Sequence, residues 1–352
     1  MRVATLNLLH GVPLRDRIAA AQAHREAQRG GGSAQRRGAV GSRAEGGVRE
    51  AADLHPSELP ERPEDLMVAG LEPTERHVWS PEVTDPGDLV RAIEELQSAG
   101  PIDVLALQEV DRYQPRSGAV DQARLAAEVI GARWWRFVPS VRGTPGIAAE
   151  GAAWVPATEA DDLPDDASEP EDPKAASLAG PRYGIALISR LPVRACRIKR
   201  FPPVPVSLPL LAPSETGRPR AIRVPDEPRS AISAVVELPH ADVTVATAHL
   251  SFVPGANTKQ LHELRAFLAG QPRPLVLMGD FNTPGSIPGL VTGWHQVART
   301  PTYPVARPRV QFDHIMVDGW TEAALDEARA SARAIALPVS DHCALVTEFP
   351  DP

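Results

Sequence analysis

One stretch of the sequence reads Leu275-Val276-Leu277-Met278-Gly279-Asp280-Phe281-Asn282. The apolar run 275–279 has the length and composition of a buried β-strand, and a carboxylate and an amide follow it at once. Side chains at the end of a strand are held firmly and are still open to a cleft, which is how a layered α/β domain builds a site. The stretch therefore predicts a strand that carries Asp280 and Asn282 into a functional site.

The same arrangement recurs along the chain, with polar side chains in or beside the ends of short apolar runs. The predicted strands are Val3–Leu9, Asp103–Gln108, Ile185–Ser189, Ile232–Leu238, Val243–Leu250, Leu275–Gly279, Phe312–Val317 and Ala344–Phe349. The polar residues that they carry or adjoin are Asn7, Glu109, His249, Asp280, Asn282, Asp313, Asp341 and His342.

Amphipathic helices are predicted between several of these strands. Asp85-Pro86 supplies an N-cap and a first-turn proline, and Gly100-Pro101 stops the segment. Further helices are predicted over 121–130 and 257–269, which end at Gly131 and Gly270. Strands mixed with helices that cover one face of each sheet indicate the α/β class.

The chain has 352 residues, of which 43% are hydrophobic, enough for a sizeable core. Length alone favours two domains, but the low-complexity stretches reduce this to a single domain over 1–352. We expect flexible insertions at about 24–80 and 155–178 and an irregular, proline-rich loop at about 201–228. The acidic run 161–172 is interpreted as part of a solvated loop rather than a catalytic carboxylate cluster, because no apolar framework adjoins it.

Charge and cysteine content restrict the function further. Lys and Arg number 37 against 45 Asp and Glu, and the net charge of −8 gives no general attraction for nucleic acid. Cys196 and Cys343 form no metal-ligand or disulfide pattern, and no apolar run approaches the roughly 20 residues that span a bilayer. The sequence predicts a soluble, cytoplasmic protein without a transmembrane segment.

The polar residues at the strand ends are mostly hard oxygen donors. Glu109, the Asn7 amide and the Asp341 carboxylate can offer a few oxygens and leave room for water and a phosphate oxygen, as Mg²⁺ prefers. Zinc would need more closely spaced His or Cys. We therefore expect Mg²⁺, with Mn²⁺ as the alternative. Each residue alone has an ordinary structural explanation, such as a turn cap or a core amide.

Their joint order resembles the endonuclease/exonuclease/phosphatase superfamily. Seven blocks carry the resemblance: Thr5-Leu6-Asn7, Leu107-Gln108-Glu109-Val110, Gly184-Ile185-Ala186-Leu187-Ile188-Ser189-Arg190, Thr247-Ala248-His249-Leu250, Gly279-Asp280-Phe281-Asn282, Phe312-Asp313-His314-Ile315 and Ser340-Asp341-His342. The resemblance runs from about Arg2 to Phe349. It implies a four-layer α/β/β/α sandwich, in which two mixed sheets pack together with helices outside.

The resemblance also implies roles for these residues. Glu109 would bind the metal directly, with Asn7 assisting and Asp341 nearby. Asp280 would orient the attacking water, and Asn282 would hold that arrangement and the phosphate. Asp313 would orient His342, and His342 and His249 would stabilise charge on the phosphoryl oxygens. Family nucleases often carry Tyr at the position of Arg182; an arginine there can still bind phosphate, so Arg182 is a predicted substrate contact. Strand alternation directs His314 away from Asp313 and out of the site.

The expected function is metal-dependent hydrolysis of a phosphodiester by a water that Asp280 orients. Two alternatives stay open. One is a phospholipid or inositol-phosphate hydrolase of the same fold, which the acidic net charge and Arg182 favour. The other is a non-catalytic binding protein on this fold, which degenerate catalytic positions would indicate. The expected partner is accordingly a phosphate ester, carried by a nucleic acid, a small molecule or a lipid headgroup.

Overall fold

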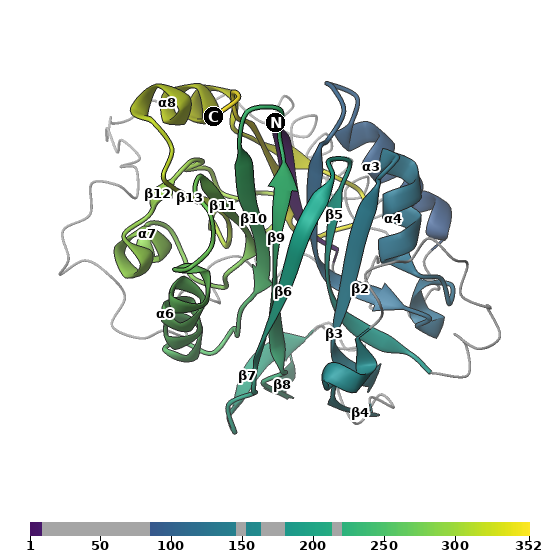
Figure 1. Ribbon diagram of the computed structural model, residues 1–352. Helices are drawn as coiled ribbons and strands as arrows, with labels where there is room; N and C mark the ends of the chain where they lie inside the picture. Colours follow the sequence, from purple (N-terminus) through teal and green to yellow (C-terminus); the bar gives the residue numbers. More distant parts are fainter. Residues whose placement is uncertain (9–84, 146–152, 163–179, 213–219) are drawn as a thin grey trace, which may run out of the picture.

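The computed structural model describes residues 1–8, 85–145, 153–162, 180–212 and 220–352, and for 209–212 and 220–223 it describes the backbone alone. Its core consists of two mixed β-sheets packed face to face (Figure 1). The seven-stranded sheet has the order β14-β15-β1-β2-β5-β3-β4. Its strands are β14 (Arg333–Ala336), β15 (Cys343–Glu348), β1 (Arg2–Asn7), β2 (Val104–Arg112), β5 (Arg182–Ser189), β3 (Trp134–Thr144) and β4 (Ala153–Pro156).

The six-stranded sheet has the order β12-β13-β11-β10-β9-β6. Its strands are β12 (His295–Gln296), β13 (Asp313–Asp318), β11 (Leu275–Asp280), β10 (Asp242–His249), β9 (Arg229–Glu237) and β6 (Val193–Phe201). Each sheet has one parallel pair, β1 with β2 and β10 with β11, among antiparallel ones. All eight strands predicted from the sequence are present, with ends that shift by a few residues.

Helices cover the outer faces of both sheets. Helices α3 (Pro86–Leu96) and α4 (Gln122–Ile130) pack on the seven-stranded sheet, and α6 (Ala256–Leu268) and the short α7 (Ile287–Thr292) lie on the six-stranded one (Figure 1). Helix α8 (Glu322–Ser331) closes the end of the sandwich that holds both termini (Figure 1). The predicted four-layer α/β/β/α sandwich is confirmed.

Local sequence explains where two of the three predicted helices begin. The Asp85 side chain accepts the Gly87 N–H before α3, and the Asp121 side chain accepts the Arg124 N–H before α4. Gly131 ends α4 with a φ of 66°, a conformation that glycine adopts without strain. No helix in the described ranges is long and apolar enough to cross a membrane.

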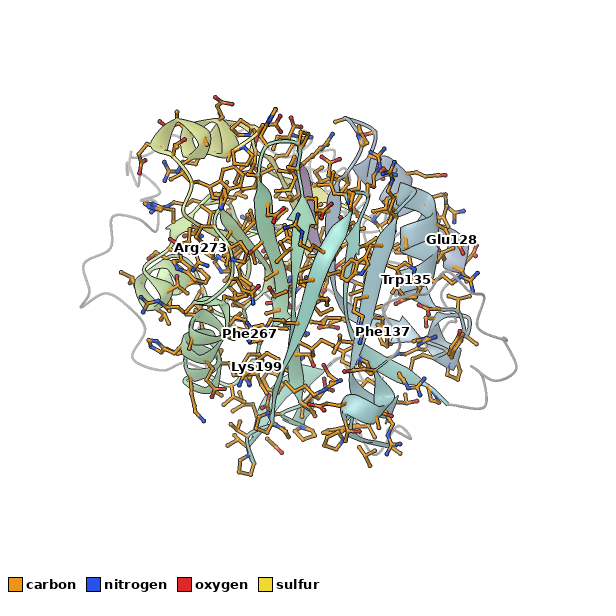
Figure 2. All side chains as sticks on the ribbon, viewed as in Figure 1. Glu128, Trp135, Phe137, Lys199, Phe267 and Arg273 are labelled. Atoms are coloured by element: carbon orange, nitrogen blue, oxygen red, sulfur yellow. The ribbon has the colours of Figure 1, made fainter. Side chains whose placement is uncertain are left out.

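Three apolar layers hold the sandwich together. The layer between the sheets contains Val104, Ile185, Val245 and Ile315, all essentially inaccessible to solvent. The outer layers lie under the helices, and Figure 2 places Phe137 on the α3–α4 side and Phe267 on the α6 side. Alternate residues of each inner strand enter opposite layers, which explains why these strands are apolar on both faces.

Two predictions about loops need correction. The proline-rich stretch 201–228 is not irregular throughout, because β7 (Ser207–Ala212) pairs with β8 (Arg220–Pro225) in a separate two-stranded sheet. Proline is tolerated in such a sheet because each strand has an unpaired edge. The predicted insertion 155–178 begins in ordered structure, with the end of β4 and a 3₁₀ turn at Glu159–Asp161.

Arginines from neighbouring strands explain the order of that acidic turn. Asp161 lies 3.4 Å from the Arg142 guanidinium, and Asp162 forms an ion pair with Arg200. Residues 163–178 of this insertion, and the whole of the predicted insertion 24–80, lie outside the described residues. The single-domain organisation of the full chain stays a prediction.

Candidate active site

Three of the predicted site residues form a row across the six-stranded sheet. His249 of β10 is in register with Asp280 of β11, and Asp280 is in register with Asp313 of β13. Neighbouring strands bring such residues to adjacent positions on one face of the sheet. All three side chains are buried. Separate sequence motifs thereby become one continuous polar strip at the end of the sandwich away from the termini.

The glycine before Asp280 permits this close pairing of β10 and β11. Gly279 has a φ of 142°, and a Cβ atom built on it would lie 2.0 Å from the carbonyl oxygen of Ala248. No other amino acid fits there without moving the backbone. The position of Asp280 at the end of β11 therefore depends on Gly279.

The seven-stranded sheet contributes Asn7 and Glu109. The register of β2 against β5 shifts between Leu107 and Val110, and Glu109 within this bulge has a φ of 56°. A bulge of this kind redirects a side chain, and a positive φ on a non-glycine residue is uncommon and concentrates at functional sites. The Asn7 amide donates to Glu109 Oε1 at 3.1 Å and to Asp280 Oδ2 at 3.0 Å. Asn7 thus joins the carboxylates of the two sheets.

The two sheets are also tied together directly below the site. Gln108 Nε2 donates to the Thr247 hydroxyl at 3.0 Å, and the Thr5 hydroxyl donates to Gln108 Oε1 at 3.2 Å. All three side chains are inaccessible to solvent. The Gln108 amide therefore fixes one sheet against the other, a role that its sequence motif alone does not indicate.

Asn282 holds the Asp280 carboxylate and the loop around it. Its backbone N–H donates to Asp280 Oδ1 at 2.8 Å, and its φ of 48° is the second positive value among the predicted site residues. Its side-chain amide donates to the Leu250 carbonyl at 3.0 Å and lies 3.4 Å from His249 Nε2. The side chain of Asn257 in turn donates to the Asn282 carbonyl at 2.7 Å.

His342 and Asp313 form a buried pair. His342 Nδ1 lies 2.7 Å from Asp313 Oδ2, and the Ser340 hydroxyl accepts the His342 N–H at 2.9 Å and donates to the Asn7 carbonyl. Burial opposes a charge on the imidazole, but Asp313, followed by Asp341 and Asp280, raises the pKa of His342 well above its usual value. This shift favours the imidazolium form of His342, in which Nε2–H is directed away from Asp313.

Two other titrating groups have strongly shifted pKa values. Burial and the nearby Asp341 raise the pKa of Glu109 to about 7. Burial also raises the pKa of Asp280 to about 6, against the opposing effect of His342. Carboxyl groups with pKa values near neutrality can take up and release protons, as general acid–base chemistry requires.

Four nitrogen–oxygen distances show how closely these side chains approach one another. Asp280 Oδ2 is 3.9 Å from His342 Nε2 and 3.9 Å from His249 Nε2. His249 Nε2 is also 3.9 Å from Glu109 Oε1, and His342 Nε2 is 3.9 Å from Asp341 Oδ1. The carboxylates and imidazoles of the two sheets therefore converge in one cluster.

Two sets of residues could hold a divalent cation. Single ligand atoms of Asp280, Asp313 and His342 lie within 4.8 Å of one another. Within this set His342 Nδ1 lies 2.7 Å from Asp313, so the set is also described as a hydrogen-bonded pair beside a carboxylate. Glu109 and Asp341 are the second set, because burial, followed by the charge of Asp341, raises the pKa of Glu109, and a cation would stabilise its ionised form.

The structure also shows site residues that sequence analysis did not find. Arg229 Nη1 lies 3.0 Å from His249 Nδ1 and 3.8 Å from Glu227. Burial, followed by the charges of Glu109 and Glu227, raises the pKa of Tyr183 well above its usual value, against the opposing effect of Arg229. Arg229 lies in a strand that the sequence predicts to begin only at Ile232, so no sequence signal distinguished it from other loop arginines.

The structure does not bring Arg182 into this group. Along β5, Ile185 and Leu187 enter the layer between the sheets, whereas Ala186 and Ile188 enter the layer under α3 and α4. Tyr183 shares the inner face, so alternation sends Arg182 to the outer face. The predicted substrate contact at Arg182 does not fit this placement, and Tyr183 lies on the inner face instead. His314 is buried outside the site, as predicted, and stacks on Phe281.

The profile of the endonuclease/exonuclease/phosphatase family matches residues 78–342. The chain belongs to this family. Family members are hydrolases that act on phosphoester bonds, and they typically use divalent metals. No curated protein matches the sequence of this family member.

Solved structures with this fold include proteins of several kinds. An endonuclease/exonuclease/phosphatase protein from Beutenbergia cavernae is 19% identical, with a TM-score of 0.40, and the match covers 75% of this chain. It covers 66% of the Beutenbergia chain, so this chain spans just under two thirds of that protein's length. A functionally unknown conserved protein from Enterococcus faecalis is 16% identical, with a TM-score of 0.45 over 78% and 98%. The human Nocturnin catalytic domain with bound sulfate is 17% identical, with a TM-score of 0.42 over 77% and 92%.

Proposed function

We propose that this family member hydrolyses a phosphodiester with the help of a divalent cation, Mg²⁺ or Mn²⁺, and a water molecule oriented by Asp280. The observation that carries the proposal is the placement of His342, whose Nδ1 is paired with Asp313 and whose Nε2 lies 3.9 Å from the Asp280 carboxylate. A cationic donor and a carboxylate acceptor then face the same small space. Hydrolysis of a phosphate ester needs both, one for the phosphoryl oxygens and one for the nucleophile.

Asp280 is suited to receive a proton from water. Its two oxygens accept hydrogen bonds from the Asn282 N–H and the Asn7 amide, which fix the plane of the carboxylate. With a pKa of about 6, it is largely ionised at neutral pH and still basic enough to take up a proton. As the water oxygen bonds to phosphorus, its proton passes to Asp280, the bond to the ester oxygen breaks, and solvent protonates the leaving oxygen.

His342 supplies a hydrogen-bond donor for the phosphoryl oxygens, and Asn282 holds Asp280 and His249 in place beside it. The His342 imidazolium cannot turn, because Asp313 holds its Nδ1–H and Tyr303 packs against its ring. Donors that are fixed in advance lose little energy to reorganisation when charge develops on the phosphoryl group. His249 lies on the other side of Asp280 and is held by Arg229 and Asn282.

Glu109 and Asp341 would hold the cation, and Asn7 would keep Glu109 in place. When bound, a divalent cation neutralises these carboxylates and polarises a phosphoryl oxygen. The raised pKa of Glu109 supports this assignment, because it reports two carboxyl groups that are crowded together in a buried place.

The proposal is tested with the purified protein and four substrates: bis(p-nitrophenyl) phosphate, p-nitrophenyl phosphate, plasmid DNA and sphingomyelin vesicles. Each assay is run with Mg²⁺, with Mn²⁺ and with EDTA. We expect turnover of a diester that EDTA abolishes and that falls by roughly 10²–10³-fold in His342→Ala. His262→Ala is the matched control, because His262 lies exposed on α6.

The outcomes separate the candidate functions. Preference for DNA indicates a nuclease, and preference for sphingomyelin indicates a lipid phosphodiesterase. Faster release of p-nitrophenol from p-nitrophenyl phosphate than from bis(p-nitrophenyl) phosphate contradicts a preference for diester hydrolysis. Turnover that persists in EDTA or in His342→Ala contradicts the mechanism.

A further inference from the structure

A segment between β12 and β13, residues 299–311, lies against the His342–Asp313 pair. Its anchor is Thr302, which is fully buried. The Thr302 hydroxyl accepts the Asp313 N–H at 3.3 Å, and its carbonyl accepts the Cys343 N–H at 2.7 Å. One residue of the segment is thus hydrogen-bonded to the backbone beside both members of the pair.

The next residue, Tyr303, is fixed by the same segment. Its N–H donates to the Val310 carbonyl at 2.9 Å, and its own carbonyl accepts the Val310 N–H at 3.0 Å. Two residues further on, the Val305 N–H donates to the Asp341 carbonyl at 2.6 Å. The backbone around Tyr303 is therefore tied to both the Asp341–Cys343 turn and the start of β13.

The ring of Tyr303 packs against the site. Its centroid lies 4.9 Å from that of His342 and 5.7 Å from that of Phe312, with the ring planes tilted by about 50° in each case. A phenylalanine would fill this space equally well. The ring alone does not explain why the position carries a hydroxyl.

The hydroxyl itself is a donor without a partner. Across the parts of the chain that the structure describes, no group forms a hydrogen bond with it, although the residue is half-buried. Burial, together with the carboxylates of Asp341, Asp280 and Glu109, raises the pKa of Tyr303 above its usual value. The phenol thus keeps its proton at neutral pH, and it lies near enough to the carboxylate cluster to be affected by all three groups.

A neutral donor in this place has a specific use. The substrate brings anionic oxygens toward a site that already holds several carboxylates, and each donor directed at those oxygens offsets the repulsion. A hydrogen bond from a neutral hydroxyl to an anionic oxygen is charge-assisted, so this donor would strengthen binding of a phosphoryl group.

We propose that the Tyr303 hydroxyl donates a hydrogen bond to a non-bridging phosphoryl oxygen of the substrate, which makes Tyr303 a further substrate-contacting residue. This inference rests on the proposed function, in that it assumes a phosphoryl group beside His342. It assigns to the 299–311 segment a direct part in binding, in addition to its packing on the imidazolium.

The test compares Tyr303→Phe with the unaltered protein. Inorganic phosphate is the probe, and its dissociation constant is measured by isothermal titration calorimetry at pH 7.5 with Mg²⁺ present. We expect binding to weaken by roughly 10- to 100-fold, the range for a lost hydrogen bond to a charged group. Tyr113→Phe is the matched control, since it removes a phenolic hydroxyl from a residue outside the group of site residues.

Rates on bis(p-nitrophenyl) phosphate distinguish this inference from the proposed function. Phosphate binding that depends on the Tyr303 hydroxyl, in a protein that cleaves no ester, supports the inference and defeats the proposed function. Equal dissociation constants for Tyr303→Phe and the unaltered protein overturn the inference even if the diester is cleaved. Absence of phosphate binding by the unaltered protein overturns it as well.

Discussion

His342 and Asp313, 29 residues apart in the sequence, meet with Nδ1 and Oδ2 separated by 2.7 Å. Asp313 belongs to the six-stranded sheet, whereas His342 immediately precedes β15 of the seven-stranded sheet. The pair therefore spans the sandwich, and its charge state depends on both sheets.

Replacing Asp313 by Asn should lower the pKa of His342, because Asp313 is the main group that stabilises the imidazolium. We expect diester turnover at neutral pH to fall by roughly 10²–10⁴-fold, with part of the activity recovered at lower pH. A pH–rate profile of the variant checks this. The control is Asp326→Asn, an exposed carboxylate of α8. A uniform loss at every pH would mean that Asp313 acts only on the fold.

Metal affinity should depend on pH around neutrality. The pKa of Glu109 is about 7 in the metal-free protein, so protons compete with a cation for this carboxylate. We expect the affinity for Mn²⁺, measured by calorimetry, to decrease as pH falls from about 8 to 6. Glu109→Gln should bind Mn²⁺ weakly at every pH. Unchanged binding in Glu109→Gln would place the cation elsewhere.

His314 should make the protein less stable in mild acid. Its Nε2 lies 2.8 Å from the Thr283 carbonyl, Gln296 donates to its Nδ1, and burial lowers its pKa to about 4. In the unfolded chain His314 takes up a proton at about pH 6.5, whereas in the folded chain it stays neutral until the pH approaches 4. The contribution of neutral His314 to the unfolding free energy is therefore fully present above pH 6.5 and is lost as pH falls toward 4. The loss is at most about 3 kcal/mol.

Denaturant unfolding of the unaltered protein and of His314→Gln between pH 4 and 8 measures this effect. The difference in unfolding free energy between the two proteins should shrink as the pH is lowered. A difference that stays constant across the range would show that His314 does not titrate in this window.

Gly279→Ala should destabilise the protein by more than about 3 kcal/mol, because the added Cβ would overlap the Ala248 carbonyl at a φ of 142°. Gly270→Ala offers a matched comparison. A Cβ at Gly270 meets no atom within 4 Å, and we expect a change within about 0.5 kcal/mol. Thermal unfolding of the two variants makes the measurement, and similar melting temperatures would contradict the explanation.

Sequence patterns predicted the inner strands and three helices because those elements carry strong local signals. Strands such as β2 and β11 are apolar on both faces, and the helices begin at Asp85 and Asp121 caps. Strand β6 has few buried residues and β12 spans only two residues, so neither has a clear pattern. Such elements depend on pairing with a neighbour, which a single segment does not encode.

The site was predictable where polar residues interrupt apolar strands in the order typical of the family. The positions of Arg229 and Tyr303 beside the site were not predictable from the sequence. An arginine beside a proline-rich loop and a tyrosine between prolines resemble ordinary loop residues. The contrast between Arg182 and Tyr183 depends on which face of β5 each occupies. That choice is fixed by the packing of the whole sheet and cannot be deduced from the motif.

The Gln108 amide that links the sheets has a consequence for how the protein fails. Each contact of the candidate site across the sandwich, from Asn7 to Asp280 and from His342 to Asp313, requires the two layers to stay aligned to within a fraction of an ångström. A slight slide of one layer over the other would part these contacts while every strand and helix stayed intact. Warming or mild denaturant should accordingly abolish the proposed activity before circular dichroism detects any loss of secondary structure. Activity is then a more sensitive measure of the alignment of the two sheets than the circular dichroism signal.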